Sequence, residues 1–484
     1  MIDLDLLRDD PDRVRRSMEA KRLGDPATVD LALDLDRQRR EAVTELNGLQ
    51  QRQGELGREI GPLMKAGKRD EAAGLLEESN AVKAQVKELE ESVRTLDADL
   101  RDAMLAIPNP IHTSVPVGGE DANVVETEWG DKPTFDFEPL PHWELAEKHG
   151  LVDFERGAKV TGAGFPFYVG KGARLQRALV ALFLDLATDA GYTEVQAPIL
   201  VNEDSGVGTG QLPDKEGQMY VIEEIDSAEV NRLLFLTRFL HEGIKLNEQY
   251  LDLQTPKSDG VTPEERIAEG KKLLDVVQEK LETAHPLYLV PTAEVPLTNY
   301  LRDEILAPDA LPIKLTGYTP CFRREAGSYG KDVRGLNRLH QFDKVELVRF
   351  VDPATSYDHL EELREDAERA VRSLGLPYRR LVLASGDLGV TQAKTYDLEV
   401  WSAGQRRWLE VSSVSNFEAY QARRANVRFR PAEGEKPQFV HTLNGSGLAL
   451  PRIVAALLEN GQQADGSVVL PERLAEVAGF DRIG

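Results

Sequence analysis

The sequence predicts an α+β protein in which an antiparallel sheet is surrounded by helices, with an N-terminal antiparallel coiled-coil arm. Apolar residues recur at alternating spacings of four and three over residues 42–100, which is typical of two helices packed as a coiled coil. After residue 125, strand-like runs pair as antiparallel strands and helical stretches lie around them. No Walker or Rossmann glycine loop occurs, so a nucleotide would be bound by strands and side chains.

Composition sets the broad class of the chain. With 484 residues it is too long for one ordinary core, so two or three domains are expected. No apolar run reaches membrane-spanning length, and the charged N-terminus lacks a signal-peptide core, so we expect a cytoplasmic protein without a membrane partner. Cys321 is the one cysteine and is expected to be a packing residue. The net charge of −24 argues against nucleic acid only weakly, because local patches decide such binding.

The N-terminal domain is expected to cover residues 1–110, with a helical hairpin over about 31–104. Asp10 and Pro11 suit the N-cap and first position of a short leading helix. Gly61, Pro62 and Gly67 are expected to break the hairpin near residues 65–69. The two apolar stripes are Ala42, Leu46, Leu49, Gln53, Leu56 and Ile60, then Leu75, Ser79, Val82, Val86, Leu89, Val93, Leu96 and Leu100.

The hairpin either mediates dimerisation or reaches a partner, and periodicity alone leaves both open. Its basic residues would be the local footprint for a nucleic acid, although by themselves they read as a solvated helix face. These residues are Arg37, Arg39, Arg40, Arg52, Arg58, Lys65, Lys68 and Arg69.

A linker rich in proline and glycine at residues 107–125 leads to a second domain over residues 111–484. Its helices are expected at residues 173–190, 358–374 and 448–459. Its strands are expected at residues 192–196, 318–322, 340–350, 396–400 and 408–414.

The segment CFRREAGSYGKDVRGLNRLHQFDKVEL, residues 321–347, gathers groups suited to a nucleotide and an amine-bearing acid. Arg323 can neutralise a phosphate, Glu325 and Glu346 can accept hydrogen bonds from amino groups, and Phe342 can stack on a base. A charged hairpin at a solvated sheet edge is the alternative interpretation of the segment alone.

This segment resembles motif 2 of the class II aminoacyl-tRNA synthetases, in the form typical of the bacterial type of the seryl-tRNA synthetase family. Further blocks follow the family's order. GYTEVQAP at residues 191–198 resembles motif 1, which builds the dimer interface, and PTAEVPLTN at residues 291–299 resembles the serine-binding loop. LEVSSVSNF at residues 409–417 and the stretch at residues 441–460 resemble the ATP-binding and motif 3 regions.

The resemblance implies a homodimeric serine–tRNA ligase. Such an enzyme activates L-serine with ATP and Mg²⁺ to seryl-adenylate and pyrophosphate, and then transfers serine to the 3′ end of tRNA(Ser), and also of tRNA(Sec). The arm would bind the tRNA, which raises the weight of its basic residues.

The resemblance also assigns site residues. Arg323 and Arg452 are implied as catalytic, and Glu410 and Ser413 as Mg²⁺ ligands. Serine would be bound by Thr292, Ala293, Glu294, Arg323, Glu346, Asn444 and Ser446. ATP would be bound by Arg323, Arg324, Glu325, Leu339, Phe342, Glu410, Val411, Ser412, Ser413 and Arg452, of which Arg324 replaces a common serine.

The sequence departs from the family in residues 221–286, where a short connection is usual. Two helix-like stretches, 228–251 and 263–284, suggest a helical insertion whose role stays open. Pro451 stands where many class II enzymes have glycine, and a first-turn proline is tolerated. Two alternatives remain: a paralogue that loads another acceptor, which should lack the arm, and a non-catalytic tRNA-binding relative, which should have lost site residues.

Overall fold

The computed structural model describes residues 1–214, 217–222, 238, 267–268, 270–272, 286–325 and 334–484. The two helical stretches expected within residues 221–286 lie almost entirely outside these ranges, as does the glycine-rich turn at residues 326–333. Within the described ranges, every helix is too short or too polar to span a membrane.

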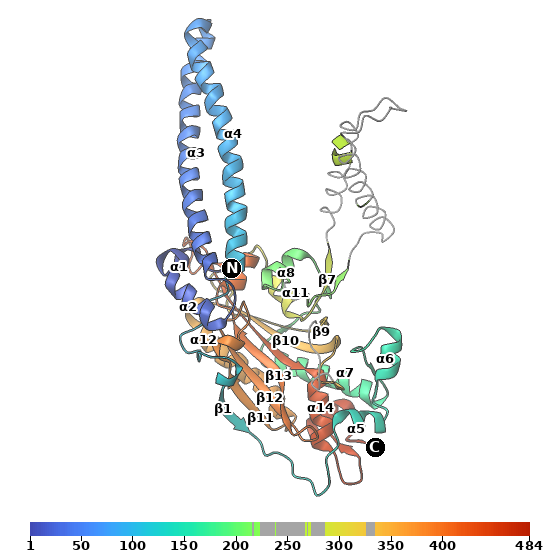
Figure 1. Cartoon of the computed structure of the whole chain (residues 1–484). Helices are drawn as coiled ribbons and strands as arrows, with labels where there is room; N and C mark the ends of the chain where they lie inside the picture. Colours follow the sequence, from blue (N-terminus) through green and yellow to red (C-terminus); the bar gives the residue numbers. More distant parts are fainter. Residues whose placement is uncertain (215–216, 223–237, 239–266, 269, 273–285, 326–333) are drawn as a thin grey trace, which may run out of the picture.

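The N-terminal region consists of helices that end in a long projecting hairpin. Its helices are α1 (Leu4–Asp9), α2 (Pro11–Lys21), α3 (Ala27–Lys65) and α4 (Arg69–Ala106). As predicted, Asp10 caps α2, since its carboxylate accepts a hydrogen bond from Arg13 N–H, and Pro11 follows at the first position. Figure 1 shows α3 and α4 running side by side away from the body of the molecule.

The apolar stripes of α3 and α4 face each other, as the heptad spacing predicts. Leu56, Val82 and Val86 are buried together, and Leu46, Leu49, Ile60 and Leu75 pack against them. The predicted break is correct in place, but two of the three residues named for it do not interrupt the helix, because α3 continues through Gly61 and Pro62 to Lys65. Gly67, the third residue named, makes the turn between the helices, in the left-handed region at φ +72°.

The body of the molecule is organised around an eight-stranded sheet within the described residues, in the order β1-β11-β12-β13-β16-β10-β9-β4. Neighbouring strands are antiparallel except the pair of β4 and β9. The strands are β1 (Val124–Trp129), β4 (Thr193–Glu194), β9 (Ile313–Phe322), β10 (Gln341–Val351), β11 (Tyr378–Val382), β12 (Lys394–Ser402), β13 (Arg407–Asn416) and β16 (His441–Ala449).

Helices and short strands surround this sheet. The helices are η1 (Glu120–Ala122), α5 (His142–Lys148), α6 (Phe154–Val160), α7 (Lys171–Asp189), α8 (Glu203–Thr209), α11 (Glu294–Asn299), η3 (Pro353–Thr355), α12 (Ser356–Ser373), η4 (Ser385–Asp387), α13 (Tyr420–Ala425), α14 (Leu450–Gly461) and α15 (Glu472–Ala478). The short strands are β2 (Val152–Asp153), β3 (Phe167–Tyr168), β5 (Leu200–Val201), β6 (Val221–Ile222), β7 (Leu287–Leu289), β8 (Ile305–Leu306), β14 (Arg428–Phe429), β15 (Gln438–Phe439), β17 (Val468–Val469) and β18 (Arg482–Ile483).

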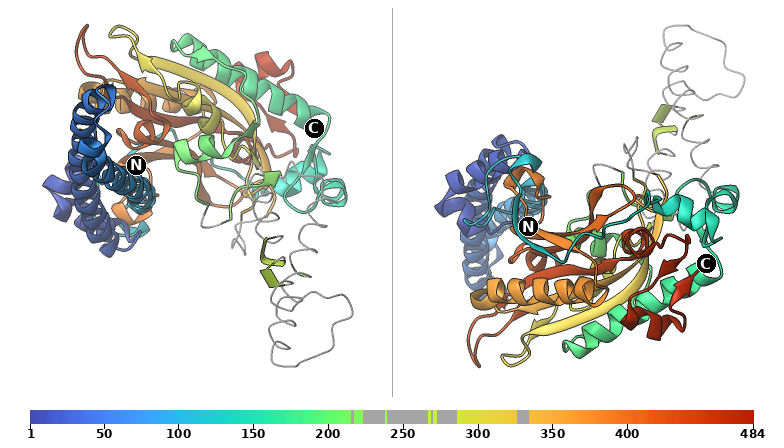
Figure 2. Two further views of the ribbon diagram at one scale, coloured as in Figure 1. Left: turned by 90° about the horizontal axis from the view of Figure 1, so that it is seen from above. Right: turned by 90° about the horizontal axis from the view of Figure 1, so that it is seen from below.

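The two faces of the sheet are covered differently. Helices α7, α12 and α14 bury one face in the largest hydrophobic cluster, and the views of Figure 2 show helices lying along the sheet. The opposite face carries a smaller cluster beneath α11 and α13, which includes Val348 and Phe350 of β10. Beyond this smaller cluster, the same face of β10 is open to a cavity. On this face of the sheet, the described residues therefore leave a polar cavity beside the smaller cluster.

The base of the arm is tied to the body by buried polar contacts. The ammonium group of Lys21, only 1 % exposed, donates hydrogen bonds to the carbonyl oxygens of Gly389 (2.9 Å) and Gln392 (2.6 Å). Burial lowers the pKa of Lys21 to about 7. Ser17 Oγ accepts a hydrogen bond from Ile111 N–H nearby. These contacts fix where α2, and the hairpin after it, meets the body.

Most predicted elements are present, with longer strands and one shifted helix. β9 (Ile313–Phe322) begins before the predicted 318–322 because its earlier residues continue the ladder with β10, whereas β10 (Gln341–Val351) keeps the predicted length and is shifted by one residue from 340–350. The helix predicted at 448–459 was wrong at its start, since Leu448 and Ala449 belong to β16 and α14 begins at Leu450. Pro451 occupies the first turn of α14, the position in which proline costs no hydrogen bond.

Candidate active site

The cavity on the sheet is built on the alternation of β10. Phe342, Lys344 and Glu346 point to the same face because side chains two residues apart share a face of a strand. Val345 and Leu347 point the other way, into the large hydrophobic cluster. Phe342 and Lys344 line a cavity of about 590 Å³, and Glu346 contacts Thr292, which also lines it. One strand therefore supplies an aromatic ring, an ammonium group and a carboxylate in succession.

Glu346 lies at the closed end of this cavity and is 1 % exposed. Its Oε2 accepts a hydrogen bond from Thr292 Oγ1 at 3.0 Å and forms an ion pair with Lys344 Nζ at 2.7 Å. Its Oε1 is buried and has no hydrogen-bond partner. An unsatisfied buried carboxylate oxygen is costly, so this atom is set to receive a donor from a bound molecule.

A second carboxylate, Glu294, lies beside Glu346 at the start of α11. Burial, and then the negative charge of Glu346, raise the pKa of Glu294 to about 7. Gln421 Nε2 donates to Glu294 Oε1 at 2.7 Å, and Gln421 Oε1 accepts from Thr442 Oγ1 at 2.8 Å. The chain of hydrogen bonds from β16 holds Glu294 against the floor of the site.

The open end of the cavity carries the groups suited to a nucleotide. The guanidinium of Arg323 lies 5.3 Å from the ring centre of Phe342, and Arg323 Nε donates to the carbonyl of Pro291 at 3.3 Å. On the other side, Arg452 Nη1 donates to the carbonyl of Glu410 at 2.8 Å. Leu339 is buried and lines the wall between them. Two cations, one aromatic ring and one apolar wall thus share one opening.

Glu410 and Ser413 are three residues apart on β13, a spacing that puts side chains on opposite faces of a regular strand. β13 is not regular here, however. Two neighbouring residues of β12, Leu398 and Glu399, pair with Ser412 and Glu410, which are two residues apart on β13. Val411 is therefore an extra residue, a β-bulge, and both Glu410 and Ser413 line the cavity.

Asp397 adds a buried carboxyl group beneath this pair. It lies opposite Ser413 on β12, and its buried Oδ1 has no hydrogen-bond partner. Burial, and then the charge of Glu410, raise the pKa of Asp397 well above its usual value. The carboxyl and hydroxyl oxygen atoms gathered here are hard ligands of the kind that a divalent cation such as Mg²⁺ prefers.

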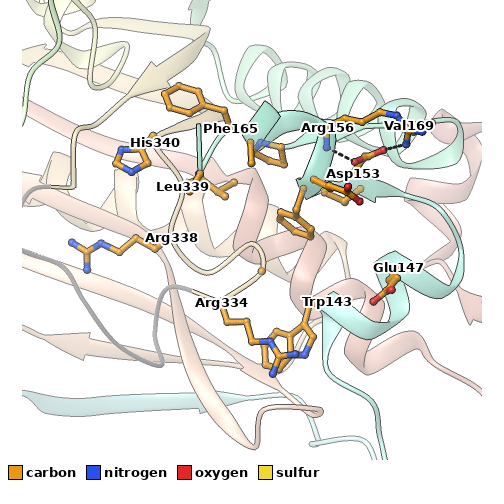
Figure 3. A pocket seen from close by; sticks show the side chains of 18 of the residues that line it. Trp143, Glu147, Asp153, Arg156, Phe165, Val169, Arg334, Arg338, Leu339 and His340 are labelled. Carbon is orange, nitrogen blue, oxygen red and sulfur yellow. Dashed lines mark hydrogen bonds and ion pairs between the residues drawn. The ribbon is translucent and has the colours of Figure 1, made fainter. Parts of the chain in front are cut away.

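Glu325 borders both this cavity and a larger neighbouring one of about 970 Å³. Its carboxylate is paired with Arg338, and its backbone has φ +50°. Figure 3 shows the larger cavity between the segment carrying Arg338 and the elements that carry Trp143 and Phe165. The residues joining Glu325 to Arg334 are outside the described part of the chain.

The structure brings together most residues that the sequence assigned to the site. Thr292, Arg323, Glu325, Leu339, Phe342, Glu410, Val411, Ser412, Ser413, Ser446 and Arg452 all line the cavity. Ala293 and Glu294 are buried behind it, and Asn444 lies on β16, two residues before Ser446 and so on the same face. Arg324 is exposed, does not line the cavity and donates its backbone N–H to the carbonyl oxygen of Gln218.

Sequence reasoning missed several residues of the site. Lys344 was available from the alternation that connects Phe342 to Glu346, since it lies between them on the same face. Gln421 and Asp397 carry no comparable signal, because each reaches the site from a separate element.

Comparison with known proteins places this fold and site in a class. Residues 277–461 match the model of the tRNA synthetase class II core domain (G, H, P, S and T), and residues 1–111 match the seryl-tRNA synthetase N-terminal domain. The chain therefore has the two parts of a class II aminoacyl-tRNA synthetase with a seryl-type N-terminal region.

Full-length relatives narrow this class. The chain is 53 % identical to a serine–tRNA ligase of Salinibacter ruber over 100 % of this chain and 99 % of that protein. It is 44 % identical to a serine–tRNA ligase of Geobacillus kaustophilus over 99 % of both chains. The crystal structure of seryl-tRNA synthetase from Pyrococcus horikoshii complexed with ATP superposes with a TM-score of 0.82 at 32 % identity, covering 100 % and 99 % of the two chains. The chain belongs to the seryl-tRNA synthetase family.

Proposed function

We propose that this protein is a serine–tRNA ligase that joins L-serine to ATP, giving seryl-adenylate and pyrophosphate, and then transfers serine to the 3′ end of tRNA(Ser). The same transfer is proposed for tRNA(Sec). Two anionic reactants meet in the first step, so neutralisation and alignment of charge are the main demands on the site. Arg323 at the junction of the two halves of the cavity supplies the cation for both reactants.

The free Oε1 of Glu346 is the observation that carries this proposal. The serine ammonium group would donate to it, and Thr292 and Lys344 hold the other oxygen so that the carboxylate cannot turn away. Ser446, paired with Glu346 across β10 and β16 and lining the cavity, would bind the substrate hydroxyl. Hydrogen bonds that require a hydroxyl discriminate strongly against alanine, because its methyl group leaves them unpaired.

On the nucleotide side, Phe342 and Arg452 would cover the two faces of adenine, and Glu325 would accept from its amino group once released from Arg338. Glu410 and Ser413 would hold Mg²⁺ together with phosphate oxygens, a common arrangement for this ion. When bound, Mg²⁺ neutralises phosphate charge. The chain's own residues align the reactants: Arg323 draws the serine carboxylate and the α-phosphate toward one point.

Residues 1–110 are proposed to bind tRNA through the hairpin, and residues 111–484 to carry the catalytic site. The hairpin supports this because it presents basic side chains far from the sheet. A homodimer is proposed through the sheet edge, where β4 and the apolar residues Ile199 and Leu200 are exposed. A cytoplasmic location is proposed as well, because ATP, serine and tRNA are available there.

Amino-acid-dependent exchange between pyrophosphate and ATP tests the first step. We expect exchange with serine in the absence of tRNA, and rates at least about 100-fold lower with alanine, glycine and threonine. Equal exchange with all four would show that the serine pocket is wrongly assigned. A chain that exchanges with serine but does not charge tRNA would favour the paralogue that loads another acceptor.

A shortened hairpin tests the second step. Removing residues 46–59 and 76–89 takes two heptads from each helix, about 21 Å of length, and keeps the register and the turn at Gly67. We expect serine-dependent exchange at the wild-type rate and loss of tRNA(Ser) charging. Charging at the wild-type rate would contradict the role proposed for the hairpin.

A further inference from the structure

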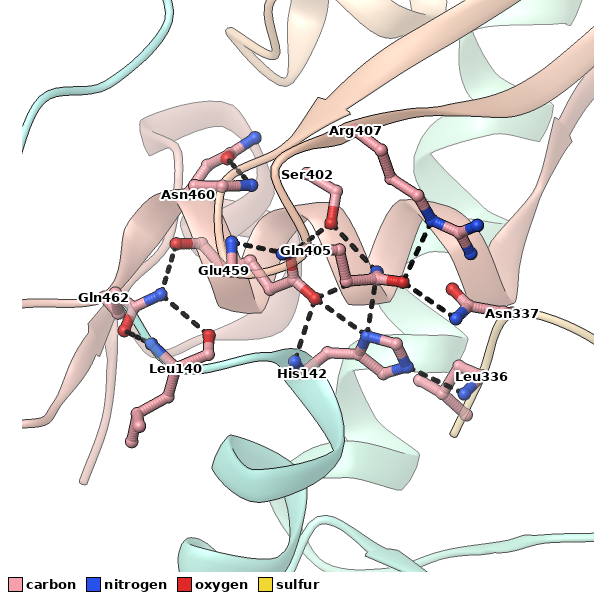
Figure 4. A network of polar contacts seen from close by, with 12 residues as sticks. Leu140, His142, Leu336, Asn337, Ser402, Gln405, Arg407, Glu459, Asn460 and Gln462 are labelled. Atoms are coloured by element: carbon pink, nitrogen blue, oxygen red, sulfur yellow. Dashed lines mark hydrogen bonds and ion pairs between the residues drawn. The ribbon is translucent and has the colours of Figure 1, made fainter. Parts of the chain in front are cut away.

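A buried polar network behind the nucleotide site connects segments that are far apart in the sequence. His142 at the start of α5 and Glu459 near the end of α14 are both 0 % exposed, and His142 Nδ1 lies 2.8 Å from Glu459 Oε1. Figure 4 shows this pair surrounded by Ser402, Gln405 and Asn337. None of these residues has a part in the proposed chemistry, yet burying charge and polar groups is costly unless each is satisfied.

Glu459 is the centre of the network. Its oxygens accept hydrogen bonds from the backbone N–H of His142 (2.9 Å), Gly404 (2.9 Å) and Gln405 (3.2 Å), and from the hydroxyl of Ser402. Burial acts to raise the pKa of Glu459, but the hydrogen bonds from His142 and Ser402 outweigh it and lower that pKa overall. Glu459 is therefore a fixed carboxylate to which two other segments are attached, one at His142 and one at residues 402–405.

The hydrogen bonds of His142 determine its tautomer. His142 Nε2 lies 2.8 Å from the backbone N of Leu336, which can only donate, so Nε2 is the acceptor and carries no proton. The ring proton is then on Nδ1 and points to Glu459. The imidazole thus bridges the Glu459 carboxylate and the backbone N–H of Leu336, which belong to separate segments.

The segment that His142 holds leads directly to the nucleotide site. Gly335, at φ +68°, lies so close that an added Cβ would be 2.4 Å from His142 Nε2. Asn337 Nδ2 donates to Gln405 Oε1 at 2.8 Å, and Gln405 Nε2 donates to Glu459 Oε1 at 3.1 Å. Gly335 to Asn337 is therefore docked at two points on the same buried carboxylate, once through an imidazole and once through an amide.

A further contact joins this segment to α14, the helix that also carries Glu459. The carbonyl oxygen of Asn337 accepts a hydrogen bond from Arg452 Nε at 3.1 Å, and Arg452 is in the first turn of α14. Glu459 is seven residues further along the same helix, about 10 Å away. A closed ring of contacts thus runs from Arg452 through Asn337, His142 and Glu459 back to α14.

We propose that His142 is a positioning residue for ATP, which sets the plane of the Arg452 guanidinium by holding the carbonyl of Asn337 in place. The inference rests on the proposed function for the identity of the nucleotide. His142 touches no reactant; it acts through Leu336 and Asn337. Serine binds at the other end of the cavity, at Glu346, and none of the described contacts of the ring reaches it.

A matched pair of substitutions separates this role from plain packing. The amide of glutamine extends to the position of Nε2, so His142→Gln can still accept from Leu336 N–H. The amide of asparagine reaches only the position of Nδ1, so His142→Asn keeps a donor to Glu459 and loses Leu336. Asn460→Ala is the control, because Asn460 ties α14 to Trp401 and Ala403 without touching the segment from Gly335 to Asn337.

The measurement is the dissociation constant of ATP and of serine for each full-length variant, by calorimetry. We expect His142→Asn to weaken ATP binding about tenfold, equivalent to about 1.4 kcal/mol, with serine binding within twofold of wild type. His142→Gln and Asn460→Ala should bind ATP within threefold of wild type. Equal ATP binding by the asparagine and glutamine variants, or an equal loss of serine binding, would overturn the proposal.

A second variant and a separate exchange measurement complete the test. If His142→Asn does not fold, Gln405→Met removes the amide that connects Asn337 to Glu459 and is expected to weaken ATP binding about threefold in the same selective way; unchanged binding would count against the ring. Wild-type exchange with serine is measured separately. Its absence would remove the proposed function, while the binding constants would still decide whether His142 orders a nucleotide site.

Discussion

The hairpin and the sheet cavity both contain ion pairs between a basic side chain and a glutamate, but the pair on the hairpin is exposed and the pair in the cavity is buried. On the hairpin, Arg52 and Glu78 pair at 2.9 Å with side chains 38 % and 44 % exposed. In the cavity, Lys344 and Glu346 pair at 2.7 Å with side chains 7 % and 1 % exposed. Water and salt screen the first pair but hardly reach the second. The comparison teaches that charge on the hairpin is replaceable one residue at a time, whereas charge in the cavity is not.

The largest contrast is expected from the same change made in both regions. Glu346→Gln keeps an acceptor for Thr292 and Lys344 but removes the negative charge. We expect the serine concentration for half-maximal exchange to rise about 1,000-fold, about 4 kcal/mol, with the ATP requirement little changed. Glu78→Gln on the hairpin should leave both values as in wild type. Similar losses from the two variants would break the comparison.

A pH experiment examines the second buried carboxylate. The pKa of Glu294 is about 7 in the folded protein against 4.5 when unfolded, so the folded state holds its proton more tightly. The stability this gives is complete below pH 4.5 and is lost as the pH rises through 7. Relative to Glu294→Gln, the wild type should therefore lose about 3 kcal/mol between pH 4 and pH 8. Unfolding curves of both proteins across this range measure it, and parallel curves would show that Glu294 titrates normally.

Removing a proposed ligand of Mg²⁺ tests the exposed edge of the cavity. Glu410 has a side chain 49 % exposed, so its effect should lie between those of the deep cavity and of the hairpin. We expect Glu410→Gln to raise the Mg²⁺ concentration needed for tight ATP binding about tenfold, as followed by calorimetry. ATP binding without Mg²⁺ should stay as in wild type. An unchanged requirement for Mg²⁺ would remove Glu410 from the ligand set.

The smallest effect is expected from Arg52→Ala on the hairpin. Arg52 pairs with Glu78 in solvent, and exposed pairs contribute little. The melting temperature should change by less than about 2 °C, and exchange should not change. A shift of several degrees would mean that the hairpin depends on its surface charges, contrary to the comparison.

The parts of the fold that depend on local periodicity could be predicted from the sequence. Leu56, Val82 and Val86 meet because heptads place them on one stripe, and Asp10 caps α2 because side-chain capping needs only neighbours. Glu410 and Ser413 were paired by resemblance alone. Their spacing places them on opposite faces of a regular strand, and the bulge at Val411 that unites them depends on β12.

What could not be predicted depends on tertiary contacts between distant segments. His142 is 194 residues from Leu336 and 317 from Glu459, and no pattern in the sequence relates them. Leu448 was placed in a helix because its neighbours are apolar, but pairing with β10 extends β16 through Ala449. Local propensity decides such residues only when no neighbouring strand competes.

The way the hairpin is anchored also has a mechanical consequence. α3 has 39 residues and is therefore about 58 Å long, so it acts as a lever whose pivot is near the carbonyls of Gly389 and Gln392 that hold Lys21. At that length, a tilt of about 5° at the pivot moves the tip by about 5 Å, more than the length of a hydrogen bond. The position of the tip is therefore determined by a few atoms at the base of the arm, far from any molecule that the tip would contact.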